Sequence, residues 1–264
     1  MNGGIIMSHF SVGVIVQEPD DLCQAMAPYG ECSEEFYERM EYMSLEDYIY
    51  QYRTYHNNAE NMTDADIIAQ AMEEYDDVED GIIYIHCNPR AHWDWWSVGG
   101  RWRYGLKVYK NAPQIKDQDL YREEPRKQRG KYRWVDGAKI KDIQWDKMNT
   151  PDQEAIKHWS RLWDVVVENH PLEEGELPYH CYGAAYYRNK YGTKENFIMK
   201  QTLFSTFALL DDIENEWYEE GNMGWFGIDD GDNDGLDAYL EHFYNTIRKP
   251  EYQDYWFIVV DCHI

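Results

Sequence analysis

The order of apolar and polar positions predicts a chain in which strands and helices follow one another. Apolar and β-branched residues fill Phe10–Val16 and predict a buried strand. Helices are predicted over 45–55 and 64–75, because a Ser or Thr precedes each segment at the spacing to an Asp that caps a helix. The other predicted elements are strands over 81–86, 104–109, 132–135 and 202–210, short strands over 216–218 and 225–228, a helix over 151–169 capped by Thr150, and a helix over 236–247.

The last apolar run bears most directly on the fold class. Tyr255–Val260 is apolar at every position, which is typical of a strand covered on both faces at the centre of a sheet. Strands are predicted early, midway and at the end of the chain, and the helices between them do not alternate strictly with strands. The sequence therefore predicts an α+β fold. We expect a single domain over residues 1–264, with a mixed or mostly antiparallel sheet, the N- and C-terminal strands in its core, and helices packed on it.

Composition predicts a folded protein of the cytoplasm. Hydrophobic residues make up 43% and aromatic residues 16% of the 264 positions, which excludes a disordered chain. No run approaches the roughly 18–20 apolar residues that a membrane-spanning helix needs, and the first residues lack the features of a signal peptide. The five cysteines are odd in number and never form a CxxC pair, so we expect reduced thiols and no thiolate zinc site.

Charge is distributed unevenly along the chain. The net charge of −25 argues against direct binding to nucleic acid or to an anionic membrane. Residues 99–147 nevertheless hold 14 basic and 7 acidic residues, whereas residues 1–98 hold 3 basic and 20 acidic ones. A long basic loop is predicted over 111–131. Its basic residues, continued by Arg133, either close over a bound anion or form a solvated loop between two strands.

An aromatic and basic segment after the predicted strand over 81–86 is the strongest candidate for a site. It combines flat rings that stack on a base, guanidinium groups that bind phosphate, and a Gly-Gly turn that lets backbone amides approach a ligand. This is the composition of a nucleotide pocket. The same residues equally suit a second small core closed by a hairpin turn. The candidate ligand-binding residues are Arg90, His92, Trp93, Trp95, Trp96, Gly99, Gly100, Arg101 and Trp102.

Two groups of residues are candidates for metal binding. Oxygen-bearing side chains at calcium-loop spacing, with glycine at the sixth position, are Asp230, Asp232, Asp234 and Glu241. The alternative is an acidic cap for the helix that follows, since turn and strand residues stand where an entering helix belongs. Pairing of the first and last strands would bring His9 near His263, but no diagnostic metal-site spacing is present. We therefore expect no cofactor, with calcium as the alternative.

Six short motifs together resemble a bacteriophage-encoded protein family without an assigned activity. They span nearly the whole chain in a single order. The motifs are Ser8-His9-Phe10, Ala27-Pro28-Tyr29, Trp93-Asp94-Trp95-Trp96 continuing to Gly99-Gly100-Arg101-Trp102, Phe204-Ser205-Thr206-Phe207-Ala208, Trp217-Tyr218 continuing to Met223-Gly224-Trp225, and Val260-Asp261-Cys262-His263-Ile264. The resemblance implies a protein that acts in the cytoplasm of an infected bacterium. It also implies a start at Met7, so that residues 1–6 form a disordered extension.

Three functions are compatible with these features. In the first, which we favour, a phage accessory protein binds and sequesters an anionic nucleotide-like small molecule, and so counters host defence signalling. In the second, the acidic helices imitate nucleic acid and occupy a basic groove of a host defence protein. In the third, the protein hydrolyses a signalling nucleotide, with acids, bases or metal ligands among Asp261, His263, His86 and His92. Binding is favoured over catalysis because the sequence contains no familiar catalytic motif, and a homo-oligomer is compatible with it.

Overall fold

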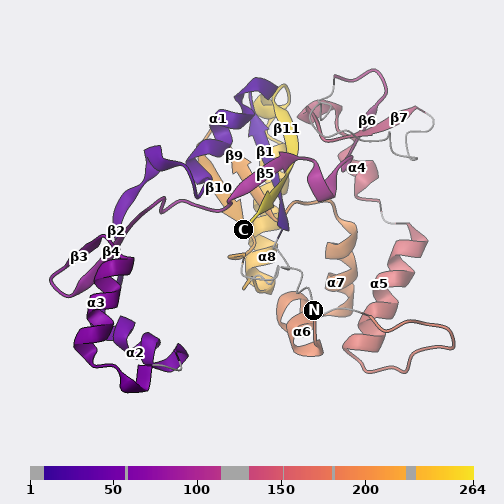
Figure 1. Ribbon diagram of the computed structural model, residues 1–264. Helices are drawn as coiled ribbons and strands as arrows, with labels where there is room; N and C mark the ends of the chain where they lie inside the picture. Colours follow the sequence, from indigo (N-terminus) through magenta and orange to yellow (C-terminus); the bar gives the residue numbers. More distant parts are fainter. Residues whose placement is uncertain (1–8, 57–58, 114–130, 151, 180–181, 224–229) are drawn as a thin grey trace. The chain divides into compact units, whose positions relative to one another are not determined.

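In a computed structural model, the chain forms two compact units (Figure 1). Unit 1 comprises Met1–Ala25 and Trp95–Ile264, and unit 2 comprises Met26–Asp94. Helices and strands occur in both units, which confirms the predicted α+β class. The prediction of one domain over the whole chain stays a prediction. The described residues are 9–56, 59–113, 131–150, 152–179, 182–223 and 230–264.

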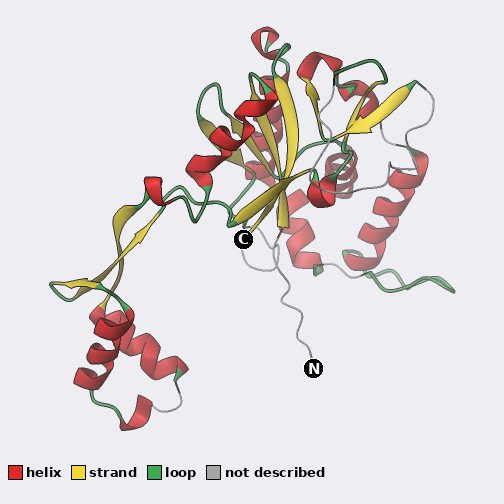
Figure 2. Cartoon of the chain, turned by 45° about the horizontal axis from the view of Figure 1, so that its top comes forward, coloured by secondary structure: helices red, strands yellow, loops and turns green. Residues whose placement is uncertain are grey.

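A mixed sheet forms the centre of unit 1 (Figure 2). In spatial order its strands are β10 (Glu216–Glu219), β9 (Ala208–Asp211), β1 (His9–Val16), β11 (Trp256–His263) and β5 (Trp95–Val98), and β8 (Gly137–Lys139) pairs with another part of β11. Strand β1 runs parallel to β9 and antiparallel to β11. Every residue of β11 is buried, as its apolar run predicts. The two terminal strands are therefore neighbours in the core, and this prediction is confirmed.

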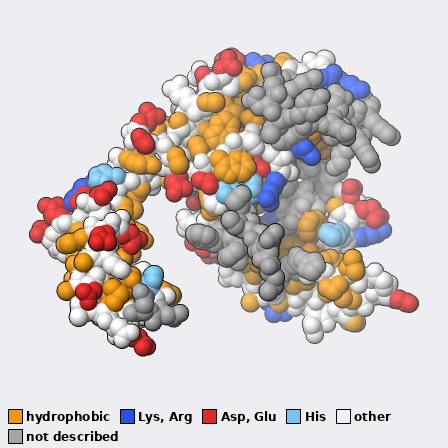
Figure 3. All heavy atoms as spheres, viewed as in Figure 1, with side chains coloured by type: hydrophobic (Ala, Val, Ile, Leu, Met, Phe, Trp, Pro, Cys, Tyr) orange, Lys and Arg blue, Asp and Glu red, His pale blue; other side chains and the backbone are white. Residues whose placement is uncertain are grey.

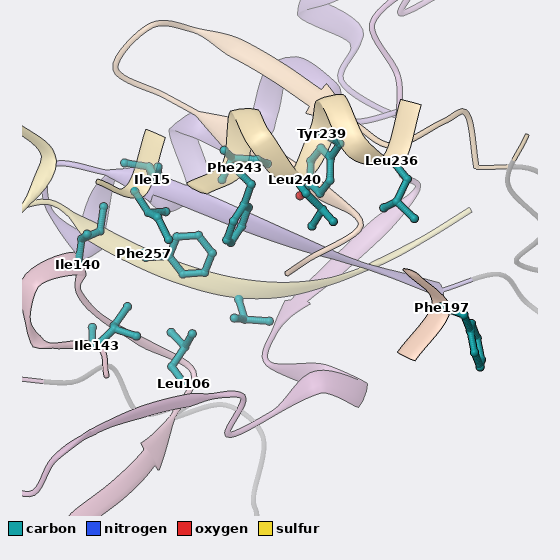
Figure 4. Close-up of a cluster of buried hydrophobic side chains, with 14 of the residues drawn as sticks. Ile15, Leu106, Ile140, Ile143, Phe197, Leu236, Tyr239, Leu240, Phe243 and Phe257 are labelled. Carbon is teal, nitrogen blue, oxygen red and sulfur yellow. The ribbon is translucent and has the colours of Figure 1, made fainter. Parts of the chain in front are cut away.

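Helix α8 (Asn233–Ile247) packs on this sheet (Figure 4). Its Phe243 side chain lies against Phe257 of β11, and Leu240 belongs to the same buried cluster as Ile15 of β1. The rings of Phe243 and Phe257 meet at right angles, with their centroids 5.8 Å apart. Burial of each such side chain stabilises the fold by about 1.5–3 kcal/mol. The predicted helix over 236–247 is confirmed, and it begins three residues earlier because Asp232 caps it.

Three further helices of unit 1 join the same core. They are α5 (Gln153–Val166), α6 (Ala184–Tyr191) and α7 (Lys194–Thr202). The ring of Phe197 on α7 contacts Trp163 on α5 and Tyr187 on α6, at centroid distances of 5.5 and 5.4 Å. Aromatic side chains far apart in the sequence thus hold these helices together.

Two sequence predictions in this region are wrong. A strand is predicted over 202–210, but α7 ends at Thr202 and only Ala208–Asp211 joins the sheet. Thr150 does not cap α5, because its hydroxyl donates to the carbonyl of Asp146 in the preceding turn. Asp152 caps α5 instead, and its side chain accepts the Ala155 amide at 2.6 Å.

A separate hairpin in unit 1 consists of β6 (Leu106–Tyr109) and β7 (Tyr132–Val135). Both strands are predicted from the sequence, and the short helix α4 (Trp145–Met148) follows them. Most of the predicted loop over 111–131 lies outside the described residues, as do the extension over 1–6 and the predicted strand over 225–228.

Unit 2 contains a small antiparallel sheet and two helices. The sheet has the order β2 (Glu38–Ser44), β4 (Ile82–Cys87) and β3 (Asp77–Glu79), and the helices are α2 (Leu45–Tyr55) and α3 (Asp64–Glu74). The predicted caps are present, since Ser44 accepts the Asp47 amide at 3.0 Å and Thr63 accepts the Asp66 amide at 3.2 Å. The strand predicted over 81–86 is present as β4, and of its residues only Ile83 is buried. One thin sheet cannot cover both of its faces.

Two simpler expectations can be compared with the described residues. None of their helices combines the length and the apolar character that a membrane crossing needs. The cysteines of these residues form no disulfide; they are Cys23, Cys32, Cys87 and Cys262.

Candidate functional site

The nine candidate residues of the aromatic and basic segment are divided between the two units. Arg90, His92 and Trp93 belong to unit 2, whereas the six from Trp95 to Trp102 belong to unit 1. The boundary falls directly before β5, which pairs antiparallel with β11 and so holds Trp95 and Trp96 at an edge of the central sheet. The strand character of residues 95–98 is a feature that the sequence analysis missed.

In unit 2, Arg90 and His92 pack on Tyr29. Arg90 Nη2 donates to the Tyr29 hydroxyl at 2.8 Å, and the His92 ring lies 5.9 Å from the Tyr29 ring. Burial, together with the neighbouring Arg90 charge, lowers the pKa of His92 to about 4, so this imidazole is uncharged at neutral pH. The buried Asn88 amide donates to two carbonyls on either side of Tyr29, both at 2.9 Å. These contacts join two segments of unit 2, and ligand binding by Arg90 and His92 stays a prediction.

In unit 1, the Gly99-Gly100 turn encloses two buried carboxylates. Both glycines have positive φ angles, of 71° and 46°. A Cβ atom on Gly100 would lie 2.1 Å from the Cβ atom of Asp261, and one on Gly99 would lie 2.6 Å from the carboxyl carbon of Asp136. The amide of Arg101 donates to Asp261 at 2.8 Å. Glycine is therefore needed here for close packing against aspartates that are each only 2% exposed.

The paired ends of β1 and β11 bring two histidines and an aspartate together. His9 lies opposite His263, as the sequence predicts, and their ring centroids are 5.0 Å apart. Asp261 Oδ1 lies 2.8 Å from His9 Nδ1, which favours the tautomer with its proton on Nδ1 and leaves Nε2 as the basic nitrogen. The Trp95 ring stacks on His263 at 5.2 Å and is 41% exposed. A histidine–carboxylate pair thus lies beside an aromatic face that solvent reaches.

The hairpin of β6 and β7 carries a lysine–tyrosine cluster, made up of Lys107, Tyr109, Lys131, Tyr132 and Lys147. The Nζ atoms of Lys147, Lys107 and Lys131 lie 4.7, 5.0 and 5.3 Å from the centroid of the Tyr132 ring. The rings of Tyr109 and Tyr132 stack at 5.2 Å. Lys147 donates to the Tyr132 hydroxyl, and this bond, with the nearby ammonium charges, lowers the pKa of Tyr132.

A cavity of about 300 Å³ adjoins the lysine–tyrosine cluster at Lys147. Residues of α4 and the end of α8 line it, including Trp145, Asn149, Tyr244 and Arg248. Asn149 Oδ1 accepts the Tyr244 hydroxyl at 3.1 Å, and the Arg248 guanidinium lies 5.3 Å from the Tyr244 ring centroid. The volume lies at the lower end of the range for small-molecule pockets, about 300–1,000 Å³.

The acidic segment before α8 has the bonding of a helix cap. Asp232 accepts the Gly235 amide at 2.8 Å, and Asp230 accepts the backbone amide of Asn222 at 2.7 Å. Within the described ranges, no three His, Cys, Asp or Glu side chains are grouped so that they would hold a metal ion. The cap that the sequence analysis proposed is present, and calcium binding at Asp230, Asp232, Asp234 and Glu241 stays a prediction.

Comparison of the chain with family models, with curated proteins and with solved structures finds no match. The resemblance to a phage-encoded family therefore stays a prediction, and function has to be inferred from the residues themselves.

The lysine–tyrosine cluster was not singled out from the sequence, although a signal for it is present. Alternate residues of a strand share a face, so Lys107 and Tyr109 project on one side of β6. Tyr132 and Trp134 do the same on β7, and the register places Tyr109 opposite Tyr132 and Lys107 opposite Trp134. Lys147 joins them only through the path of the chain into α4.

Proposed function

We propose that unit 1 binds an anionic, nucleotide-like small molecule at the lysine–tyrosine cluster. The supporting observation is that three ammonium groups surround the Tyr132 ring in a protein of net charge −25. No carboxylate of the described residues forms an ion pair with any of these three lysines, whereas other lysines of unit 1 are ion-paired. Like charges held close together repel one another, and a bound phosphate relieves that repulsion.

The neighbouring rings and cavity suit the other parts of such a ligand. Stacking of a base on an aromatic ring contributes roughly 1–3 kcal/mol, and Tyr109 is partly exposed on the hairpin. The cavity next to Lys147 adds an indole, a carboxamide and a guanidinium group within one small volume. We expect the phosphate of the ligand to bind the lysines, and its base to stack on the tyrosine rings or to enter the cavity.

The resemblance to a phage-encoded family suggests the biological role of this binding. A protein that holds a signalling nucleotide of the infected bacterium lowers the free concentration of that nucleotide, and so counters defence signalling. This role needs no catalysis, only an affinity high enough to compete with the host receptor.

Calorimetry of the full chain tests the proposal. The probes are adenosine triphosphate and cyclic di-adenosine monophosphate, with uncharged adenosine as the control ligand. A charge-assisted hydrogen bond is worth roughly 1.5–3 kcal/mol, so Lys147→Met and Lys107→Met are each expected to weaken binding by about tenfold or more. Lys157→Met is the matched control, because Lys157 is exposed and, among the residues that the structure describes, pairs only with Glu154, at 3.3 Å. Unchanged affinity in the Lys107→Met/Lys147→Met double variant would place the ligand elsewhere.

A second function, hydrolysis of a signalling nucleotide, is favoured by the His9–Asp261 pair. No described residue hydrogen-bonds His9 Nε2, so this nitrogen is the candidate general base. A water oxygen would attack phosphorus while Nε2 takes the water proton, and the same proton would pass to the leaving oxygen as the ester bond breaks. Trp95 offers a face on which the base stacks.

Product formation separates the two functions. The probe nucleotides are incubated with the full chain and the mixture is resolved by chromatography. Products that disappear with His9→Asn, and persist with the cluster variant Lys107→Met, would support hydrolysis at the pair. Intact nucleotides recovered after long incubation would leave sequestration as the function.

A further inference from the structure

Unit 2 contains a pocket, here called the tyrosine pocket, with a volume of about 140 Å³. Five tyrosines line it together with a carboxylate and three other side chains; the residues are Tyr42, Tyr48, Tyr52, Tyr55, Tyr75, Glu74, Met43, Gln51 and His56. They come from β2, from α2 and from the end of α3. Tyr48 belongs to the buried core of unit 2, and Tyr52 and Tyr75 pack against that core, whereas Tyr42 and Tyr55 lie at the rim. Tyr55 is 78% exposed and Tyr42 is 47% exposed.

The rings of the tyrosine pocket are inclined to one another, so they border the pocket from several sides. The Tyr75 ring is perpendicular to that of Tyr48 at a centroid distance of 6.0 Å, and it is tilted by 34° to that of Tyr42 at 5.6 Å. The Tyr52 ring lies 6.0 Å from that of Tyr48. Ring faces and ring edges therefore border one small space, and the His56 ring, which stacks on Tyr52 at 4.2 Å, belongs to the same lining.

A carboxylate belongs to the same wall. Glu74 Oε2 accepts the Tyr48 hydroxyl at 2.8 Å, which holds the carboxylate against the rings. Burial and then the Glu74 charge raise the pKa of Tyr75 to about 12, which is consistent with a negative potential inside the pocket.

The rest of unit 2 strengthens that potential. Residues 26–94 include 17 acidic and only 3 basic residues. All three arginines already have partners: Arg39 bonds Asp77 at 2.7 Å, Arg53 bonds Asp64 at 2.7 Å, and Arg90 bonds Tyr29 at 2.8 Å. Acidic and hydrophobic side chains are interspersed over the face of unit 2 seen in Figure 3. A cation approaching the pocket thus meets an acidic surface.

We propose that the tyrosine pocket binds an arginine side chain of a basic protein partner. A planar guanidinium stacks on aromatic rings and donates hydrogen bonds to a carboxylate, and the pocket offers both kinds of group. Exposed tyrosines at the rim supply the amphipathic contact area that is enriched at protein interfaces. Nucleic acid and other anions are repelled by the same charges, so the acidic surface selects a basic protein.

Fluorescence anisotropy of the full chain tests this site. The probe is a labelled peptide with four arginines spaced by glycine and serine, and its control carries citrulline, the uncharged isostere, in place of arginine. Glu74→Gln is expected to weaken binding of the arginine peptide by about tenfold, as loss of a charged hydrogen bond does. Glu73→Gln removes the same charge from the same exposed helix end outside the pocket, and it is expected to weaken binding by less than about twofold.

Substitution of single tyrosines distinguishes binding in the tyrosine pocket from general attraction of a basic peptide to an acidic surface. Tyr52→Ala is expected to weaken binding by about two- to thirtyfold, the range for a cation–π contact. Thermal unfolding checks each variant, and Tyr55→Ala at the exposed rim replaces Tyr52→Ala if the latter does not fold. Equal losses in Glu73→Gln and Glu74→Gln would overturn the proposal. Equal affinity for the citrulline peptide would overturn it as well.

Discussion

Gly100→Ala is expected to be among the most destabilising single substitutions in unit 1. The backbone at Gly100 has a φ of 46°, a conformation that costs a residue with a Cβ atom roughly 1–2 kcal/mol. The added methyl would also lie 2.1 Å from Asp261 Cβ and 2.2 Å from its Oδ2, so the aspartate has to move.

The displaced carboxylate then loses its partners. Asp261 is 2% exposed, and it accepts from the Arg101 amide and contacts His9 Nδ1, both at 2.8 Å. A buried polar group that loses its hydrogen bond costs about 1–3 kcal/mol, and the backbone strain adds to this. We expect Gly100→Ala to lower the free energy of unfolding by about 2–5 kcal/mol, a large part of the roughly 5–15 kcal/mol that holds a typical domain folded.

Gly175→Ala is the matched control. Gly175 has a φ of 85°, and a Cβ atom there would meet nothing within 4 Å, so only the backbone strain applies. Urea unfolding followed by tryptophan fluorescence measures both variants, and the slope with denaturant shows whether the unfolding transition stays comparable. Equal losses in the two variants would refute the steric argument, because the Asp261 contact would then contribute nothing.

Three further predictions concern titration and metal binding. Burial lowers the pKa of His92 from 6.5 to about 4, so the stability that the neutral ring contributes is complete above pH 6.5 and is lost as the pH falls toward 4. The melting temperature of the wild type should therefore drop more steeply over this range than that of His92→Gln. Parallel curves would contradict the burial effect. Lys147→Met should raise the pKa of Tyr132 toward 10.0, measured by ultraviolet difference absorbance, and an unaltered titration would remove Lys147 as the cause of the shift. If the segment before α8 binds calcium, millimolar calcium should raise the melting temperature by mass action, whereas Asp232→Ala should cost about 1 kcal/mol with or without the ion through loss of the cap.

Features that depend on neighbouring residues were predictable from the sequence alone. The caps at Ser44 and Thr63 are examples, because each hydrogen bond closes within three residues along the chain. The strand after Tyr255 is another, since a run without polar side chains is stable only where both faces are covered. The apolar character of the first and last strands also predicted both in the core of the sheet, where their pairing places His9 opposite His263.

The tertiary structure decided what depends on residues far apart in the chain. Residues 202–210 have the composition of a strand, yet their first residue ends α7, whose Phe197 packs between α5 and α6. The Gly-Gly turn has the composition of a ligand loop. In the structure the turn packs against Asp261, and the carboxylate of that residue accepts the Arg101 amide from 160 positions further along the chain. No local pattern in the sequence indicates this contact.

For the candidate sites, too, the sequence shows the residue types and the tertiary structure decides which of them meet. Basic charge in the middle of the chain and tyrosine in its acidic part are visible as composition. Which lysines surround Tyr132, and which rings face Glu74, depends on the register of a hairpin and on the packing of two helices. Side-chain direction is set by those long-range contacts, and charge or ring content alone carries no information about it.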